Sequence, residues 1–386
     1  MHIAAKAASV GIALAVLGGC STLQSLNPFA SKAPPRNPPA ALVDFKPSMN
    51  VRSAWTVSLG KAGNALFNPA LASGSVFAAA ADGTIARLDA SNGNQLWRIN
   101  AGVPLTAGVG ADAGTVAVGA AGGILLVYSA DGKLRWKAQA SSEILGAPAV
   151  AQGMVIVRSI DNRIVAFDAD SGVRRWQLQR TAPALALRSA PGIAVDAQSA
   201  YVGMPGGRMV ALALSNGGPR WEVAVGDPRG ATELERIADV SGVPVMVGRE
   251  VCAVAYQGRI GCVDASSGTT RWAKEFSSEV GLGADERHVY GADERGNVNA
   301  FTFDAGLSVW RNNTLANRRL SAPVAVGRAL AVGDYQGYMH FLSREDGAIL
   351  ARSASDGSQV IGTPVVTGTT VIFQTQAGTV AALTAE

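Results

Sequence analysis

The sequence has few charged and few aromatic side chains, 16% and 6% of its 386 residues, and only three cysteines and three histidines. No two cysteines are adjacent, and the short motifs of serine nucleophiles and zinc-binding helices are absent. These absences argue against hydrolytic and metal-dependent enzymes. A formal net charge of +4 is too small a basic excess to indicate nucleic acid as a partner.

Long apolar runs are also missing, except for one at the N-terminus that is too short to span a bilayer. This run follows Lys6 and ends in Leu-Gly-Gly-Cys, which resembles the lipobox of bacterial lipoproteins. We therefore expect residues 1–19 to be a lipoprotein signal peptide and Cys20 to be the lipidated residue that anchors the chain in a membrane. An ordinary signal peptide with a coincidental cysteine is the alternative. An Asp directly after the cysteine would resemble a signal for retention in the inner membrane. Ser21 stands at that position, so this signal is absent.

Residues 20–49 are rich in proline, with Ser, Asn and Ala between the prolines. Proline at this density favours an extended chain that packs poorly. We interpret this stretch as a tether between the lipid and a folded domain, which is predicted to cover residues 50–386.

Glycine is abundant, with 45 residues, and six of them stand four positions before a tryptophan. The phrase first occurs as Gly93 to Trp97 and recurs about every 40 residues, a period in the range of propeller repeats. A seventh copy carries Ala351 in the tryptophan slot, and one tryptophan, Trp55, stands outside the series. The six slots that hold tryptophan are Trp97, Trp136, Trp176, Trp221, Trp272 and Trp310.

Each repeat contains four short β-rich runs separated by turn residues, as in residues 148–180. A second marker lies upstream of the tryptophan slot. It is Gly83 in the first repeat, and eight copies of it occur along the chain. The sequence therefore predicts an all-β fold, an eight-bladed β-propeller of four-stranded antiparallel blades. The chain ends before the eighth repeat has a fourth strand. Residues 52–58, which carry Trp55, are predicted to supply that strand and close the ring.

The tryptophan slot has two interpretations: an aromatic ligand site, or a ring that fills the junction between neighbouring blades. A residue that recurs once per blade favours the junction, because buried aromatic side chains usually belong to the core. Burial of an indole also removes about 150–250 Å² from water. On this interpretation, Ala351 marks a thinner contact in the seventh blade.

Cys252 and Cys262 lie in neighbouring runs on either side of a predicted turn. Pairing of these runs as a hairpin would place the two side chains close together. In an exported protein this arrangement permits a disulfide. Two buried free thiols are an equally good interpretation.

The recurring phrase Ala-x-Asp-x-x-x-Gly-x-x-x-Trp resembles the tryptophan-docking repeats of quinoprotein-type eight-bladed propellers. With its lipobox, Pro-rich tether and full ring, the chain is similar over its whole length to the BamB family. Members of that family are lipoprotein subunits of the β-barrel assembly (BAM) complex. The resemblance implies a non-catalytic scaffold without a cofactor, lipid-anchored at the periplasmic face of the outer membrane. It also implies a role in folding and inserting β-barrel proteins and binding to the periplasmic domains of BamA, the integral barrel subunit. Whether nascent outer-membrane proteins bind directly is left open.

Two stretches resemble the loops through which that family meets BamA. One runs from Leu185 to Arg188 and matches a Leu-x-Leu-Arg pattern; the other covers residues 232–240. The family pattern has an acidic residue at the position of Ser241, so we do not expect the corresponding contact with BamA in this chain. The partner-binding residues implied by the resemblance are Leu185, Leu187, Arg188 and Asp239.

The same two stretches stand out by spacing alone. The longest intervals between a tryptophan slot and the next inner strand run from Trp176 to Pro191 and from Trp221 to Pro244. Loops of this class leave a propeller on one face, so we expect the two to be neighbours there. The alternative is that the extra length is drift without a function. Leucine beside arginine is typical of interfaces, however, and favours a binding surface. In the longer loop, Thr232 and Glu235 have the spacing of a capping box and predict a short helix.

The competing hypothesis is a quinone- or ligand-binding propeller enzyme similar to the quinoprotein dehydrogenases. Those enzymes share a calcium site, an adjacent cysteine pair and long insertions. After processing, the chain keeps only His288 and His340, which lie far apart in the sequence and are more plausible as structural or surface residues. We therefore expect a scaffold and not an enzyme.

Overall fold

The computed structural model describes residues 37–386 apart from residues 64, 182, 189 and 190. The expected signal peptide, residues 1–19, the lipidation site Cys20 and most of the tether lie outside the described residues. Residues 39–386 form one unit. Among the described residues the only helical element is a short 3-10 turn, Ala121–Gly123 (η2), and no helix is long and apolar enough to cross a bilayer.

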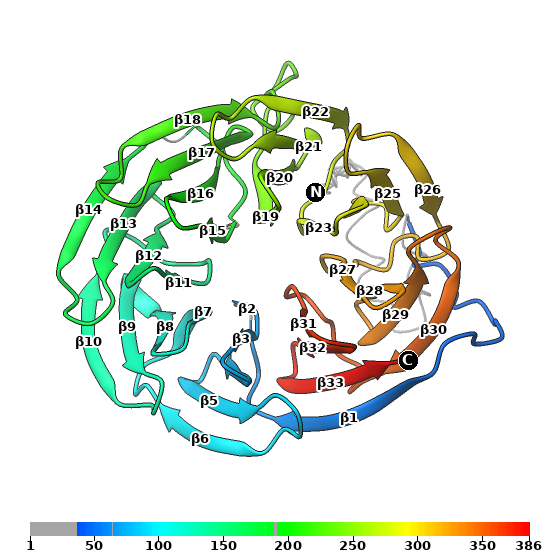
Figure 1. The fold of residues 1–386 in the computed structure, drawn as a ribbon, viewed down its shortest axis with the longest axis horizontal. Helices are drawn as coiled ribbons and strands as arrows, with labels where there is room; N and C mark the ends of the chain where they lie inside the picture. Colours follow the sequence, from blue (N-terminus) through cyan, green and yellow to red (C-terminus); the bar gives the residue numbers. More distant parts are fainter. Residues whose placement is uncertain (1–36, 64, 182, 189–190) are drawn as a thin grey trace, which may run out of the picture. The chain divides into compact units, whose positions relative to one another are not determined.

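Eight antiparallel sheets surround a central axis and confirm the predicted eight-bladed propeller (Figure 1). In blade 2 the short strand β2 (Leu66–Phe67) adds to β7 in the parallel direction. Blades 1 to 4 consist, in order, of β3 (Ala70–Ala72), β4 (Ser75–Ala79), β5 (Thr84–Asp89) and β6 (Gln95–Asn100); β7 (Leu105–Ala111), β8 (Thr115–Ala120), β9 (Ile124–Ser129) and β10 (Leu134–Gln139); β11 (Ala149–Ala151), β12 (Met154–Arg158), β13 (Arg163–Asp168) and β14 (Arg174–Gln179); β15 (Ile193–Val195), β16 (Ser199–Met204), β17 (Arg208–Ala213) and β18 (Pro219–Ala224).

The second half of the ring repeats this meander, and its last blade takes one strand from the N-terminal side of the chain. Blades 5 to 8 consist of β19 (Val240–Val247), β20 (Glu250–Ala255), β21 (Arg259–Asp264) and β22 (Thr270–Glu275); β23 (Leu282–Ala284), β24 (His288–Ala292), β25 (Val298–Thr302) and β26 (Ser308–Asn312); β27 (Val324–Val326), β28 (Ala329–Gly333), β29 (Tyr338–Ser343) and β30 (Ile349–Ala354); β31 (Val365–Thr367), β32 (Thr370–Gln374), β33 (Thr379–Ala385) and β1 (Val51–Ser58).

The core is divided among the junctions between blades. The second and third strands of each blade are rich in Val, Ile, Leu and Ala, and most of their residues are buried; β8, β16 and β20 have no exposed residue. Small and β-branched side chains suit this position, because each sheet is covered on both faces by its neighbours. Eight hydrophobic clusters result, one between each pair of adjacent blades.

One repeated contact, formed by the tryptophans, occurs at seven of the eight junctions. Each indole nitrogen donates a hydrogen bond of 2.7 to 3.0 Å to a carbonyl in the turn before the last strand of the next blade. Trp176 of blade 3, for example, donates to Leu214 of blade 4 at 2.7 Å.

The glycine of the repeated phrase serves the junction with the preceding blade. A Cβ atom at Gly217 would lie 2.5 Å from the Trp176 ring, and the φ of Gly217 is +71°. Only glycine meets both the steric and the conformational requirement. Each Gly-to-Trp phrase therefore joins its blade to two neighbours, the glycine to the blade before it and the tryptophan to the blade after it.

The ring closes where β1 pairs antiparallel with β33, from Val51 opposite Ala385 to Ser58 opposite Thr379. Trp55 on β1 is buried and donates to the Ala90 carbonyl of blade 1 at 3.0 Å. This confirms that an N-terminal strand completes the eighth blade. The two ends of the propeller are therefore neighbours in one sheet.

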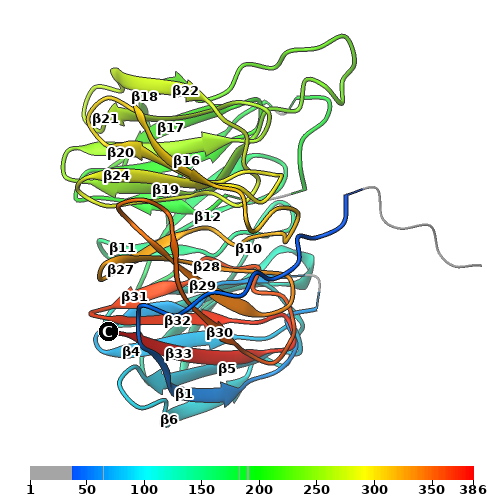
Figure 2. The same cartoon turned by 90° about the vertical axis from the view of Figure 1, so that its right-hand side faces the viewer.

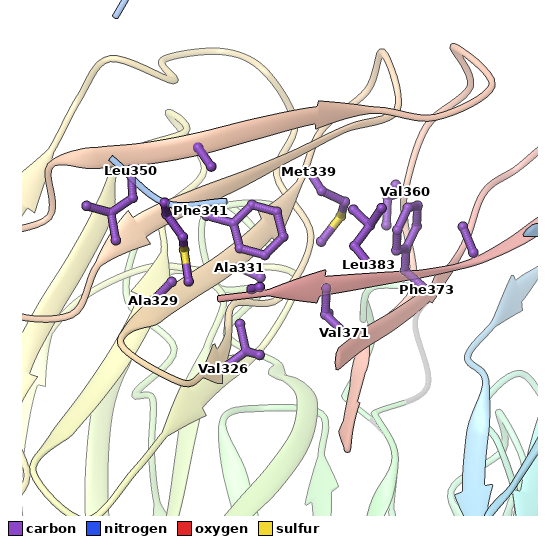
Figure 3. Packing of buried hydrophobic residues seen from close by; sticks show 14 residues of the cluster. Val326, Ala329, Ala331, Met339, Phe341, Leu350, Val360, Val371, Phe373 and Leu383 are labelled. Carbon is purple, nitrogen blue, oxygen red and sulfur yellow. The ribbon is translucent and has the colours of Figure 1, made fainter. Parts of the chain in front are cut away.

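The junction of blades 7 and 8 lacks the tryptophan contact. Its slot holds Ala351, which is buried in a cluster with Met49, Leu350, Phe341 and other apolar residues (Figure 3). The fourth strand of blade 8 is β1, from the N-terminal side of the chain, so no turn with its glycine leads from β33 into that strand to receive an indole. Met49, just before β1, packs at this junction instead, since an unbranched thioether fills irregular gaps well.

The stretch before β1 is fastened to blade 7, although the sequence indicated a tether as far as residue 49. Ala40 and Ala316 share a backbone hydrogen bond of 2.8 Å, and Arg352 donates to the Val43 carbonyl at 2.7 Å. Arg352 also lies over the Phe45 ring. The packed part of the chain therefore begins about ten residues earlier than the strand pattern indicated.

Cys252 and Cys262 face each other on β20 and β21 and form a disulfide. Both residues are fully buried within the core of blade 5. Of the two interpretations that the sequence left open, the structure contains the disulfide.

Candidate functional site

Loops that connect the last strand of one blade to the first strand of the next emerge on one face of the propeller, the loop face. Two of them, between β14 and β15 and between β18 and β19, project from it on the right of Figure 2. We call residues 183–188 the first loop and residues 226–239 the second loop. Both were predicted from spacing, and they belong to adjacent connections, as expected.

The first loop presents apolar and basic side chains. Leu185 is 45% exposed, and Leu187 is half-buried. Arg188 is exposed and forms an ion pair of 2.6 Å with Glu143, from the connection between blades 2 and 3. Such an exposed pair contributes little stability, so Arg188 can exchange Glu143 for an acidic group on a partner at small cost.

Asp239, at the end of the second loop, differs from the expectation of a direct contact. It is only 4% exposed, and its carboxylate faces the interior of the loop face. One oxygen accepts from the Leu187 N–H at 2.5 Å, and the other accepts from the Gly206 N–H at 2.9 Å. Asp239 therefore ties the two loops together, and its charge is satisfied by backbone groups of this chain. It does not pair with Arg188.

The second loop makes the hydrogen bonds of a capping box without the expected helix. Glu235 accepts from the N–H groups of Ala231 and Thr232 at 2.8 and 3.0 Å, and its own N–H donates to the Thr232 hydroxyl at 3.3 Å. Residues 233–236 form a turn, because the chain must pass inward at Ile237 to reach the buried Ala238. The prediction of a short helix was wrong.

Leu234, at the tip of this turn, is 68% exposed, the highest exposed fraction among the large apolar residues that the structure describes. Leu234 lies in the stretch that resembles the family's second loop, but the resemblance implied no role for it. An apolar residue between two glutamates in an extra-long loop was the available signal. Glu143 was missed as well, because its contact with Arg188 joins separate blades.

The first loop also borders a cavity of about 850 Å³ at the centre of the ring. Leu187 and Arg188 line it together with apolar residues from other blades, such as Leu66, Leu145 and Ile361. The exposed surface of the first loop therefore continues inward across the centre of the loop face.

Ser241 lies on β19 and is 3% exposed, so its side chain faces the core and not a partner. The two histidines among the described residues are also inside the blades. His340 contacts Asp334 at 2.9 Å, and His288 contacts the Tyr290 hydroxyl at 3.2 Å. Burial lowers the pKa of both histidines, although nearby carboxylates oppose it. No group of three or more His, Cys, Asp or Glu side chains in the described part of the chain is arranged to hold a metal ion.

Comparison with known proteins identifies relatives over nearly the whole chain. The family model for the outer membrane protein assembly factor BamB matches residues 81–312 and 294–386. The outer membrane protein assembly factor BamB of Burkholderia pseudomallei is 42% identical over 375 residues, which cover 96% of each chain.

Solved structures agree with these matches. The crystal structure of BamB from Moraxella catarrhalis superposes with a TM-score of 0.79 at 27% identity, covering 87% of this chain and all of that chain. A quinohemoprotein alcohol dehydrogenase from Pseudomonas putida gives a TM-score of 0.67 at 14% identity, covering 87% of this chain and 76% of the enzyme. At that identity, the likeness to the enzyme extends to the fold alone.

Proposed function

Because the chain belongs to the family of the outer membrane protein assembly factor BamB, we propose that it is a non-catalytic assembly factor of the outer membrane. It helps β-barrel proteins to fold and insert by binding BamA. It is anchored by lipid on Cys20 and acts at the periplasmic face of the membrane. The periplasmic domains of BamA dock on the loop face of the propeller.

The observation that carries this proposal is the composition of the two loops. Leu185 in the first loop and Leu234 in the second loop are exposed, and both loops project from one face of the propeller (Figure 2). Arg188 lies beside Leu187, and its only ion-pair partner among the described residues is the surface residue Glu143. Exposed apolar anchors next to an arginine are the side chains in which binding energy usually concentrates.

The four residues expected to bind the partner then divide into two roles. Leu185, Leu187 and Arg188 touch BamA, with Leu234 as a further contact from the second loop. Asp239 is buried, so it contributes by holding the first loop at Leu187. An extended segment of BamA that lies across both loops would meet all four contact residues.

The test is a pull-down of the BamA periplasmic domains with the Leu187→Ala variant. Truncation of a binding anchor costs about 2 kcal/mol or more, so BamA should be lost from the bound fraction. Leu307→Ala is the matched control, because Leu307 is an exposed leucine in the turn before β26, on the opposite face. If both variants retain BamA equally, the loop face is not the docking site.

A further inference from the structure

Arg158 is a buried arginine beneath the two loops. It is the last residue of β12 in blade 3 and is 6% exposed. One guanidinium nitrogen donates to the Gly203 carbonyl of blade 4 at 3.2 Å, and another donates to the Asn162 side-chain oxygen at 3.0 Å. The third nitrogen, Nε, is buried without a hydrogen-bond partner among the described residues. A charge in this position is costly unless something balances it.

The balancing group is Asp239. Its carboxylate binds the Gly206 N–H in the turn between β16 and β17, and Arg158 binds the carbonyl of Gly203 near the end of β16, so the two side chains hold neighbouring backbone groups of blade 4. No ion pair joins them directly. Burial lowers the pKa of Arg158 to about 10, and the negative charge of Asp239 opposes this effect. Arg158 therefore stays charged at neutral pH, and the two opposite charges stabilise each other across the turn.

We propose that Arg158 is a positioning residue for the partner site, supplying the buried positive charge that keeps the Asp239 carboxylate fixed on the Leu187 N–H. We call Arg158, Asp239 and the Leu187 N–H the latch. It holds the first loop in the shape that docks the partner. The inference rests on the function proposed above, because it explains how the contact residues of that site are held.

The latch matters because the first loop has few other fixed points. Residues 183–186 are exposed, and the bond at Leu187 ties the loop to the second one. The apparent affinity of such a loop is its intrinsic affinity multiplied by the fraction of time that the loop spends in the binding shape. Loss of the buried positive charge would weaken the hold of Asp239 and lower that fraction without changing any contact residue.

Lysine cannot replace Arg158 in this role. The guanidinium directs separate nitrogens at a carbonyl of blade 4 and an amide oxygen of blade 3. A lysine ammonium is a single point charge on a flexible stem and cannot reproduce this fork. Arg158→Lys should therefore preserve the charge and lose part of the geometry.

The direct test is hydrogen exchange at the Leu187 amide in the full chain without partner, combined with the affinity for BamA periplasmic domains. Loss of a buried hydrogen bond to a charged group changes an equilibrium constant roughly tenfold or more. Arg158→Met should speed exchange at Leu187 and weaken binding, each about tenfold. The exchange rate and affinity of Arg158→Lys should lie between those of Arg158→Met and the original protein. Arg87→Met is the matched control, since Arg87 is a partly buried arginine that bridges Ser75 and the Ala130 carbonyl far from the loops.

Exchange and binding together separate the two proposals. If exchange at Leu187 is unchanged in Arg158→Met while Leu187→Ala still releases BamA, the latch is wrong and the docking site stands. If exchange rises but Leu187→Ala has no effect on BamA, the latch exists and the docking site is wrong. Should Arg158→Met fail to fold, Arg158→Lys is the second variant, because it leaves Asp239 and the Leu187 N–H unchanged. Faster exchange at Leu187 in Arg158→Lys supports the latch, whereas unchanged exchange overturns it.

Discussion

The junctions between blades and the two loops on the loop face are built in opposite ways. At seven junctions the same indole donates to the same kind of carbonyl and packs on the same kind of glycine. The two loops carry no copy of this contact: each has an exposed leucine, Leu185 or Leu234, while an arginine paired with another blade and a buried aspartate occur once each. A contact that recurs in every blade explains the ring and cannot select a partner. Recognition is therefore expected where the repeat breaks.

The seam between blades 7 and 8 sharpens this contrast, because the repeat also breaks there. The break has a structural cause: β1 supplies the fourth strand of blade 8, so no turn from β33 receives an indole, and Met49 fills the space. Irregularity alone is thus not a sign of function. The loops differ from the seam because they present exposed side chains, those of Leu185, Arg188 and Leu234.

The largest expected effect is on closure of the ring. Deletion of residues 50–58 removes β1, its pairing with β33 and the Trp55 contact with blade 1. The cooperative thermal unfolding transition should be lost or shifted strongly downward. Deletion of residues 22–36, in the Pro-rich stretch, is the control and should leave the melting temperature unchanged. Equal melting of the two variants would rule out closure by β1.

A single junction should be the next most sensitive. Trp176 is buried between blades 3 and 4, so Trp176→Ala should lower the free energy of unfolding by about 3–5 kcal/mol. Chemical denaturation measures this. A loss under about 0.5 kcal/mol, typical of surface positions, would return the tryptophans to the ligand-site interpretation.

At the seam the opposite substitution should be harmful. Ala351→Trp would place an indole where Met49 and Leu350 already pack and where no turn can accept its hydrogen bond. Overpacking of this kind costs about 1–3 kcal/mol. A gain in unfolding free energy would mean that the seam has room for the standard junction.

The smallest effect should come from the surface of the seam. Arg52 and Glu386 form an ion pair of 2.8 Å, but both side chains are more than half exposed. Arg52→Ala should therefore lower the free energy of unfolding by less than about 1 kcal/mol, and high salt should remove the difference. A larger loss would show that this ion pair helps to close the ring.

The regular part of the molecule could be predicted from the sequence because each blade repeats the same physical requirement. Gly217 and Trp176 belong to different repeats but meet in space, and the constant spacing reflects that contact. Loop length predicted the face of the site, since an insertion between outer and inner strands can emerge only there. These arguments need no knowledge of side-chain direction.

The details that escaped the sequence depend on direction and on distant contacts. An aspartate that binds backbone N–H groups and one that faces a partner look alike in a sequence, so the burial of Asp239 was not foreseen. The bond between Cys252 and Cys262 depends on a strand register that one residue would change. Met49 could not be placed at the seam because no repeat contains its counterpart.

The central claim is that the repeated contacts build the ring and the loops bind the partner. The most direct measurement is the affinity of the BamA periplasmic domains for Trp176→Ala and Arg188→Ala, at a temperature where both are folded, together with their unfolding free energies. We expect Trp176→Ala to lose stability and keep its affinity. Arg188→Ala should keep its stability and lose about 2 kcal/mol of binding free energy. Loss of affinity in Trp176→Ala, or unchanged affinity in Arg188→Ala, would contradict the account.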